Sequence, residues 1–204
     1  MLALTIPNHQ VHEGVATWVR EHDWHLDVTM IYPGLLPMHS HYDGVLTTVN
    51  RMEVVDWLAK CTCPIVRMIG TPSPEIESAI AHYPQVIVDD HSVGVLGARH
   101  LLRLGQPTFA FYQRTGCLQA LAVQRGFVTT LKTHGRTAQL IDFYGDHPEL
   151  KIGTLMPQEK RLGWLREKLR ALPLPAAIMA EDDRRALELV TVIRDLGLRI
   201  PQDI

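Results

Sequence analysis

The sequence predicts an α/β fold of doubly wound parallel sheets. Short apolar runs alternate with longer segments of helical periodicity along the 204 residues. Strands separated by helices must run parallel, joined by right-handed crossovers. The apolar runs also lack strict alternation, as expected of strands that helices cover on both faces. A chain of this length can form one large domain or two small lobes.

The elements of the first half follow from apolar runs and the residues that break them. Pro7 and Asn8 end the first run, and the helix that follows carries Val11, Val15 and Trp18 on one face. The stretch "PGLLPMHSHYD" and the turn-rich "GTPSPE" are expected to be loops. In this half we expect strands at 2–6, 26–32, 44–48, 64–69 and 86–88, and helices at 9–22 and 52–60.

The second half repeats the pattern with clearer ends. Gly105 and Gly197 each follow a periodic segment and are expected to end a helix as C-caps. Gly94 and Gly97 lie inside a predicted helix and indicate close helix–sheet packing. Strands are expected at 108–112, 139–144 and 176–180, and helices at 91–104, 118–132, 158–172 and 182–196.

Composition limits the classes of function. Hydrophobic residues make up 46% and charged residues 21% of the chain, and the net charge is −2, so no nucleic-acid-binding surface is expected on this chain alone. No apolar run reaches the ~18 residues of a membrane span. The first residues lack the pattern of a signal peptide. The three cysteines Cys61, Cys63 and Cys117 suit a reducing compartment better than a disulfide framework. We therefore expect a cytoplasmic protein without membrane contact.

The last residues, "LGLRIPQDI", lead towards a further strand. A parallel sheet needs that strand beside the last helix, so we expect the chain to be C-terminally truncated. The alternative is a natural frayed end.

Enzyme chemistry finds no support in the motifs. The sequence contains no phosphate-binding loop, no Gly-x-Ser-x-Gly and no His-Glu-x-x-His. His39 and His41 lie two residues apart near Asp43, but no partner motif accompanies them, and a solvated loop is expected. We expect no catalytic residues, no metal and no cofactor.

Asp89 and Asp90 follow a predicted strand, at the position where open α/β sheets bind ligands. A phosphate would need glycines and free backbone N–H groups there. Carboxylates instead repel phosphate and accept hydrogen bonds from hydroxyl groups, which favours a sugar-like ligand. The alternative is structural: Asp90 caps the helix and Asp89 stabilises its dipole.

Several motifs resemble a known family. The stretch from Asp89-Asp90 through "HLLRLG" to "PTFAFY", the segment "LPAAIMAEDDRRALELVTVIRDLGLRIPQDI" and the weaker "QRGFVTTL" are similar to the effector-binding core of the lactose-repressor/galactose-repressor superfamily, a type I periplasmic-binding-protein-like fold. Within it, the start of the chain and "TFAFYQ" are similar to the N-terminal sensor of xylose-responsive AraC-type regulators (XylR). The resemblance implies two lobes, at 1–88 and 89–204, the second incomplete.

The resemblance also implies ligand-binding positions. Asp182 would contact the effector from the second lobe, or else cap the helix in competition with Asp183. Arg114 would lie at the cleft rim, or else be an exposed loop arginine. In the family an arginine stands three residues before a Gly-Phe pair. Here Val123 stands there, and Arg125, which directly precedes Gly126, is the expected ligand contact of this helix. Asn8 and His9 follow the first strand and fit the opposite lip of the cleft. For Asn8 the alternative is a helix cap.

These features together predict a sugar-sensing effector domain of a transcription regulator. It would bind xylose or a related pentose and respond by closure of its lobes. By resemblance we expect a homodimer, and DNA contact only through a domain missing from this chain. A transport-type sugar-binding protein with the same fold is the alternative, against which the absent signal peptide and the free cysteines argue.

Overall fold

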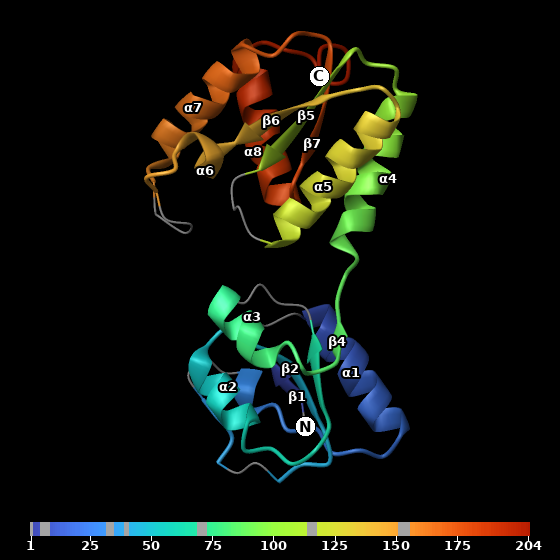
Figure 1. Cartoon of the computed structure of the whole chain (residues 1–204), viewed down its shortest axis with the longest axis vertical. Helices are drawn as coiled ribbons and strands as arrows, with labels where there is room; N and C mark the ends of the chain where they lie inside the picture. The colour runs from blue at the N-terminus through green and yellow to red at the C-terminus, as the bar shows by residue number, and fades with distance from the viewer. Residues whose placement is uncertain are drawn as a thin grey trace. The chain divides into compact units, whose positions relative to one another are not determined.

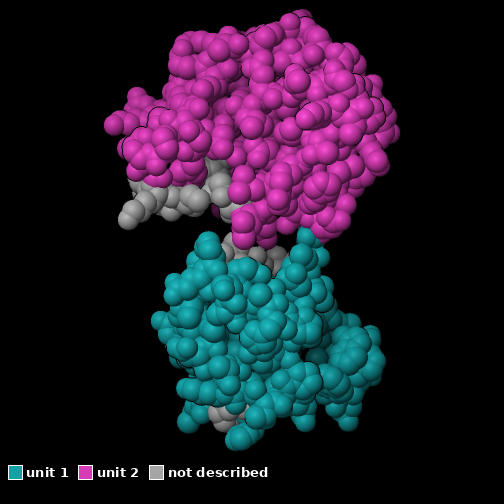
Figure 2. Space-filling view, viewed as in Figure 1, with its two compact units in different colours: residues 1–88 teal, residues 89–204 magenta. Residues whose placement is uncertain are grey.

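The computed structural model describes residues 2–4, 9–31, 35–38, 41–68, 73–113, 118–150 and 156–204. The chain divides into two compact units, unit 1 over Met1–Val88 and unit 2 over Asp89–Ile204 (Figures 1 and 2). Every strand pairing in either unit is parallel. The predicted α/β class with parallel sheets is therefore confirmed.

Unit 1 is built on a four-stranded sheet in the order β1-β2-β3-β4. Its strands are β1 (Leu2–Leu4), β2 (Val45–Thr48), β3 (Ile65–Met68) and β4 (Gln85–Val86). Its helices are α1 (His9–Glu21), α2 (Met52–Leu58), α3 (Pro74–Ile80) and the short 3₁₀ helix η1 (Thr29–Ile31). Alternate strand residues serve the two faces of this sheet, as the pleat requires.

One face of this sheet is closely packed and the other is not. Val45 and Ile65 join α2 and α3 in a buried core. On the other face, Leu46 and Val66 line a cavity of about 560 Å³ together with α1. No described residue of α1 is buried, although the helix carries the predicted apolar face.

The predicted strand at 26–32 is wrong for its described residues. Residues 29–31 form η1 instead. The reason is local, because the Asp27 carboxylate accepts hydrogen bonds from both the backbone N–H and the hydroxyl of Thr29, at 2.9 Å and 2.7 Å. This side-chain turn competes with the strand, and Met30 then packs into the core of unit 1.

The stretch "GTPSPE" is predicted as a loop, but its last two residues, Pro74 and Glu75, belong to α3, a helix absent from the predicted elements. Ser73 caps this helix by accepting a hydrogen bond from the Ile76 N–H, and Pro74 occupies its first turn. The predicted buried strand at 86–88 is also corrected. β4 ends at Val86 and lies at the edge of the sheet, so Val86, Ile87 and Val88 are exposed.

Unit 2 has three layers around a three-stranded sheet in the order β6-β5-β7. Its strands are β5 (Thr108–Gln113), β6 (Ala138–Asp142) and β7 (Ala176–Ala180). Its helices are α4 (Asp90–Arg103), α5 (Leu118–Thr133), α6 (Phe143–Asp146), α7 (Gln158–Arg170) and α8 (Asp183–Asp195). Residues predicted as the end of a strand at 139–144 thus divide between β6 and the short α6.

The central strand β5 connects the two cores of unit 2. Phe109 and Phe111 pack against α4 and α5. Ala110 and Tyr112 pack against α7 and α8 on the opposite face. A strand buried on both faces explains why this run shows no polar alternation.

Two glycines allow α4 and α5 to touch. A Cβ on Gly94 would lie 1.9 Å from the Val123 carbonyl oxygen, and one on Gly126 would lie 2.1 Å from the His91 carbonyl oxygen. The predicted helix–sheet role therefore fits only Gly97, whose Cβ would meet the side chain of Met179 in β7. Gly105 and Gly197 both have φ of +71° and directly follow the C-cap residues Leu104 and Leu196, which confirms that the helices end at these glycines.

Candidate functional site

Polar side chains gather where the three strands of unit 2 end. Gln113 is the last residue of β5, Asp142 is the last residue of β6, and Glu181 and Asp182 directly follow β7. Because the strands are parallel and adjacent, these ends lie at one edge of the sheet. Ligands of open α/β sheets bind at this carboxyl edge.

Gln113 and Asp142 are joined directly. The Gln113 side-chain amide donates to Asp142 Oδ2 at 2.7 Å, and the Gly145 N–H donates to Oδ1 at 3.0 Å. Gln113 is 1% exposed, and its Oε1 is buried without a hydrogen-bond partner among the described residues. A buried acceptor without a donor is uncommon in folded proteins, and it marks this position as a candidate contact for a ligand or water.

Asp182 serves two purposes at once. Its Oδ1 accepts from the Arg185 N–H at 2.7 Å, which makes it the N-cap of α8. Among the described residues, its Oδ2 is paired only with the exposed Arg184 Nε, at 4.0 Å, and the side chain is 38% exposed. One oxygen therefore fixes the helix while the other is accessible, so the capping and the binding interpretations are compatible.

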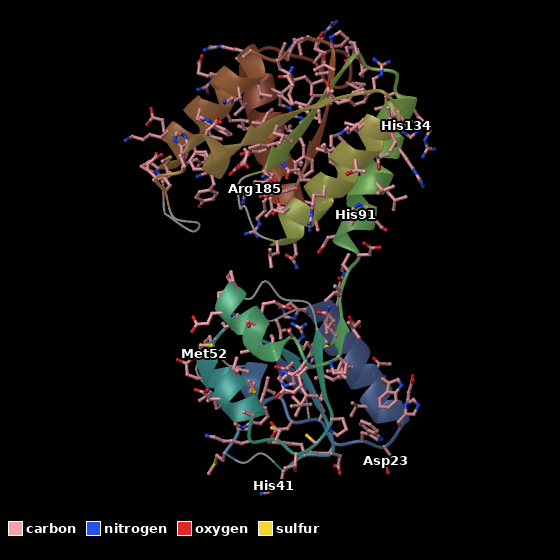
Figure 3. The ribbon with its side chains drawn as sticks, in the orientation of Figure 1. Asp23, His41, Met52, His91, His134 and Arg185 are labelled. Atoms are coloured by element: carbon pink, nitrogen blue, oxygen red, sulfur yellow. The ribbon has the colours of Figure 1, made fainter. Side chains whose placement is uncertain are left out.

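A buried network of charges supports this edge. Arg185 contacts Glu188 through Nη1 at 2.9 Å, and its Nε lies 3.4 Å from Glu181 and 3.6 Å from Asp182. Glu188 also accepts from Tyr112 and from Arg161, each at 2.8 Å. Figure 3 labels Arg185, near the point where β5 ends.

The pKa of Glu188 is set by the side chains of this network. Burial alone would raise the pKa of its carboxyl group. The hydrogen bond from Tyr112 and the charges of Arg185 and Arg161 outweigh burial, and the pKa lies below its ordinary value. Glu188 is therefore ionised at neutral pH.

Asp89 and Asp90 belong to the start of α4. The capping alternative named Asp90 as the N-cap, and this is corrected, because the N-cap is Asp89. Both Asp89 oxygens are engaged by Ser92, which donates its N–H at 3.0 Å and its hydroxyl at 2.6 Å. These hydrogen bonds lower the pKa of Asp89, while burial and the neighbouring Asp89 charge raise the pKa of Asp90.

Of the remaining predicted ligand residues, two are described by the structure and two are not. His9 is the exposed first residue of α1 in unit 1, and Arg125 is exposed on α5. Asn8 and Arg114 lie outside the described residues. Within the described ranges, no hydrogen bond or ion pair connects Asp182 with Asp89.

Sequence reasoning missed four residues of this edge: Gln113, Asp142, Glu181 and Arg185. The rule that selected Asp89 also fits Gln113 and Glu181, because each directly follows a predicted apolar strand. Asp142 was hidden by a predicted strand that ran two residues too far. Arg185 did carry a signal, because Glu181, Asp182 and Glu188 stand four and three residues before it and three residues after it, a spacing that predicts ion pairs along one helix. Only the burial of these pairs depends on how α8 packs on the sheet.

The arrangement offers acceptors rather than a cation-rich pocket. The carboxylates at the edge are Asp142, Glu181 and Asp182, and the buried guanidinium group beside them, of Arg185, already pairs with Glu188. Such a surface binds hydroxyl donors and repels phosphate. In the described part of the chain, no cluster of three or more histidine, cysteine, aspartate or glutamate side chains could hold a metal ion. Nor does any helix there have the length and apolar character to cross a membrane.

Comparison with known proteins agrees with this architecture. The family described as "Periplasmic binding protein-like domain" matches residues 98–204, which is more than half of the chain. The arabinose metabolism transcriptional repressor of Geobacillus stearothermophilus is 31% identical over 124 residues, which cover 59% of this chain and 32% of the repressor.

Solved structures share the fold at lower identity. The xylose-binding transcription activator xylR superposes with a TM-score of 0.72 at 20% identity, over 98% of this chain and 51% of that one. A LacI-family regulator from Enterococcus faecium with bound ribose gives 0.63 at 16% identity, over 99% of this chain and 74% of the other.

This chain thus spans about a third of the curated relative and about half of the activator. Since the family match extends across nearly all of unit 2, the chain belongs to the periplasmic-binding-protein-like domain family.

Proposed function

We propose that this chain is the sugar-binding effector module of a transcription regulator, and that its ligand is xylose or a related pentose. The observation that carries the proposal is the row of acceptors at the carboxyl edge of unit 2, with Gln113, Asp142 and the accessible oxygen of Asp182. A neutral sugar presents several hydroxyl donors to such a row.

The sugars that appear in the names of the relatives support this ligand class. One relative takes its name from arabinose metabolism, one solved structure is a xylose-binding activator, and others hold ribose or D-xylulofuranose. Each of the sugars in these names is uncharged and has five carbons. The proposal extends that class, and the role as a non-catalytic sensor, to this chain.

The proposed mechanism is closure of the two units around the sugar. A ligand shifts such an equilibrium only if it binds one state more tightly, so residues from both units must contribute. On the unit 1 side His9 and Asn8 keep their predicted role, and on the unit 2 side Asp89, Asp90, Arg114 and Arg125 join Asp182. DNA contact would belong to a domain outside these 204 residues, as in the AraC-type resemblance, and the module would act as a cytoplasmic homodimer.

Thermal unfolding with a panel of ligands tests the proposal. We expect D-xylose, L-arabinose or D-ribose to raise the midpoint of unfolding in a concentration-dependent manner, as linkage requires. D-Ribose 5-phosphate should have a smaller effect than D-ribose, because the carboxylates repel its charge. A chain that no pentose stabilises, or that prefers the phosphate, would overturn the proposal.

Asp182→Asn tests the site itself. Asparagine caps a helix about as well as aspartate, so the fold should keep its stability. The variant replaces one carboxylate oxygen by an amide, and we expect the Kd for the sugar to rise at least tenfold while it stays measurable, so that the sugar-dependent stabilisation shrinks. Asp183→Asn, the same change at the exposed neighbouring position, should bind like the unmodified chain.

A further inference from the structure

Glu188 lies at the centre of the buried charge network and has no direct place at the sheet edge. Its Oε2 accepts from the Tyr112 hydroxyl at 2.8 Å. Its Oε1 accepts from Arg161 Nη2 at 2.8 Å and from Arg185 Nη1 at 2.9 Å. The three donors come from β5, α7 and α8, so one carboxylate joins the central strand to both helices on this face.

Arg185 carries the network on to the edge. Its side chain is 5% exposed, and its Nε lies between Glu181 Oε1 at 3.4 Å and Asp182 Oδ1 at 3.6 Å. Because Nη1 is bound to Glu188, the guanidinium plane cannot turn freely. The same residue donates its backbone N–H to Asp182 Oδ1 at 2.7 Å. The orientation of the Asp182 carboxylate therefore depends on Arg185 twice.

Arg185 Nε contacts Glu181 and Asp182 as ion pairs only, and it forms no hydrogen bond within the described part of the chain. Arg161 Nε likewise forms no hydrogen bond there. Leaving such donors unsatisfied costs stability, and a buried ion pair seldom stabilises a fold more than apolar residues of the same shape. A contribution to stability alone therefore explains this network poorly. A role in orienting the Asp182 carboxylate at the sheet edge explains it better.

We infer that Glu188 and Arg185 are positioning residues for the sugar. Glu188 fixes the guanidinium of Arg185, and Arg185 in turn holds Asp182 with its second oxygen directed away from the helix. Neither residue needs to touch the ligand. This inference rests on the proposed function, because it assumes that Asp182 accepts a hydrogen bond from the sugar.

The test compares affinities for the pentose that binds the unmodified chain most tightly, measured by calorimetric titration. Glu188→Gln removes the charge that holds Arg185, and we expect the Kd to rise at least tenfold. Glu167→Gln is the matched control, because it makes the same change on α7 at a side chain that is 70% exposed. Its Kd should stay within twofold.

A double-mutant cycle separates positioning from general weakening of the fold. If Glu188 acts through Asp182, the double variant Asp182→Asn with Glu188→Gln should bind no more weakly than Asp182→Asn alone. Losses that simply add would assign Glu188 a structural role and overturn the inference. An unchanged Kd for Glu188→Gln would do the same.

Tyr112→Phe keeps the test valid if Glu188→Gln does not fold. It removes only the hydroxyl group that donates to Glu188 and leaves the ring in the core, and we expect a smaller rise in Kd of about threefold. Affinity equal to that of the unmodified chain would count against positioning. If the unmodified chain binds no pentose, the proposed function fails, and the inference fails with it. If the unmodified chain binds a pentose and the variants bind it equally well, only the inference fails.

Discussion

Asp89 and Asp182 each precede a helix, yet they use their oxygens differently. Asp89 gives both oxygens to Ser92. Position 185, three residues after Asp182, holds an arginine without a hydroxyl group, so the second oxygen of Asp182 stays accessible. At the residue scale, a serine or an arginine three positions after the cap decides how fully the carboxylate is engaged.

A second effect at this scale is the close contact of α4 and α5. We expect Gly94→Ala to lower the free energy of unfolding by about 2–3 kcal/mol, since the new methyl group would overlap the Val123 carbonyl oxygen. Urea-induced unfolding followed by circular dichroism measures this change.

Gly163→Ala is the control, because nothing lies within 4 Å of the added Cβ in α7. Removing a glycine from a helix interior should stabilise unit 2 by about 0.5–1 kcal/mol. Equal effects of the two substitutions would contradict the account of the helix contact.

At the scale of elements, local hydrogen bonds override apolar pattern in unit 1. The Asp27 carboxylate bends 29–31 into η1, and Ser73 begins α3 in a stretch rich in turn residues. In each case a single polar side chain forms the helical turn by a hydrogen bond to a backbone N–H two or three residues further on. Apolar periodicity does not include these contacts, which is why a strand was predicted in place of η1 and why α3 was not predicted.

Arg67 shows how a weak edge strand is held. It is buried on β3 and donates to Glu77 of α3 and to Gln85 of β4, each at 2.8 Å. We expect Arg67→Ala to lower the free energy of unfolding by about 2–3 kcal/mol, because both partners lose their donor.

Arg170→Ala provides the comparison for this prediction. Arg170 pairs with Glu167 on the surface of α7, where both side chains are more than half exposed. Its loss should change stability by less than about 0.5 kcal/mol. Chemical denaturation of both variants measures the two changes in the free energy of unfolding. A similarly small loss for Arg67→Ala would show that β4 does not depend on this arginine.

At the scale of the whole molecule, each cluster of buried apolar residues belongs to one unit. The core under α2 and α3 lies within Met1–Val88, and the two cores of unit 2 lie within Asp89–Ile204. A unit with its own core can fold by itself.

We therefore expect a fragment of residues 88–204 to unfold cooperatively, with the helical circular dichroism of unit 2 retained. A fragment of residues 93–204 lacks the Asp89 cap and should be less stable by about 1 kcal/mol. A first fragment without cooperative unfolding would show that unit 2 needs unit 1 for its fold.

The sequence by itself determined the fold class, the helix ends at Gly105 and Gly197, and the placing of acidic residues after strands. These features are local, because periodicity, left-handed glycines and strand–acid–helix junctions each lie within a few neighbouring residues. The family resemblance rests on the same junctions.

Tertiary structure decided which of those residues meet. Gln113 contacts Asp142 only because β5 and β6 are neighbours, and Glu188 reaches Tyr112 across 76 positions of sequence. Arg185 pairs with residues close to it in sequence, and the packing of α8 against the sheet buries those pairs. Contacts between distant segments depend on how strands are ordered and how helices pack, and no pattern within a short window of sequence records that order.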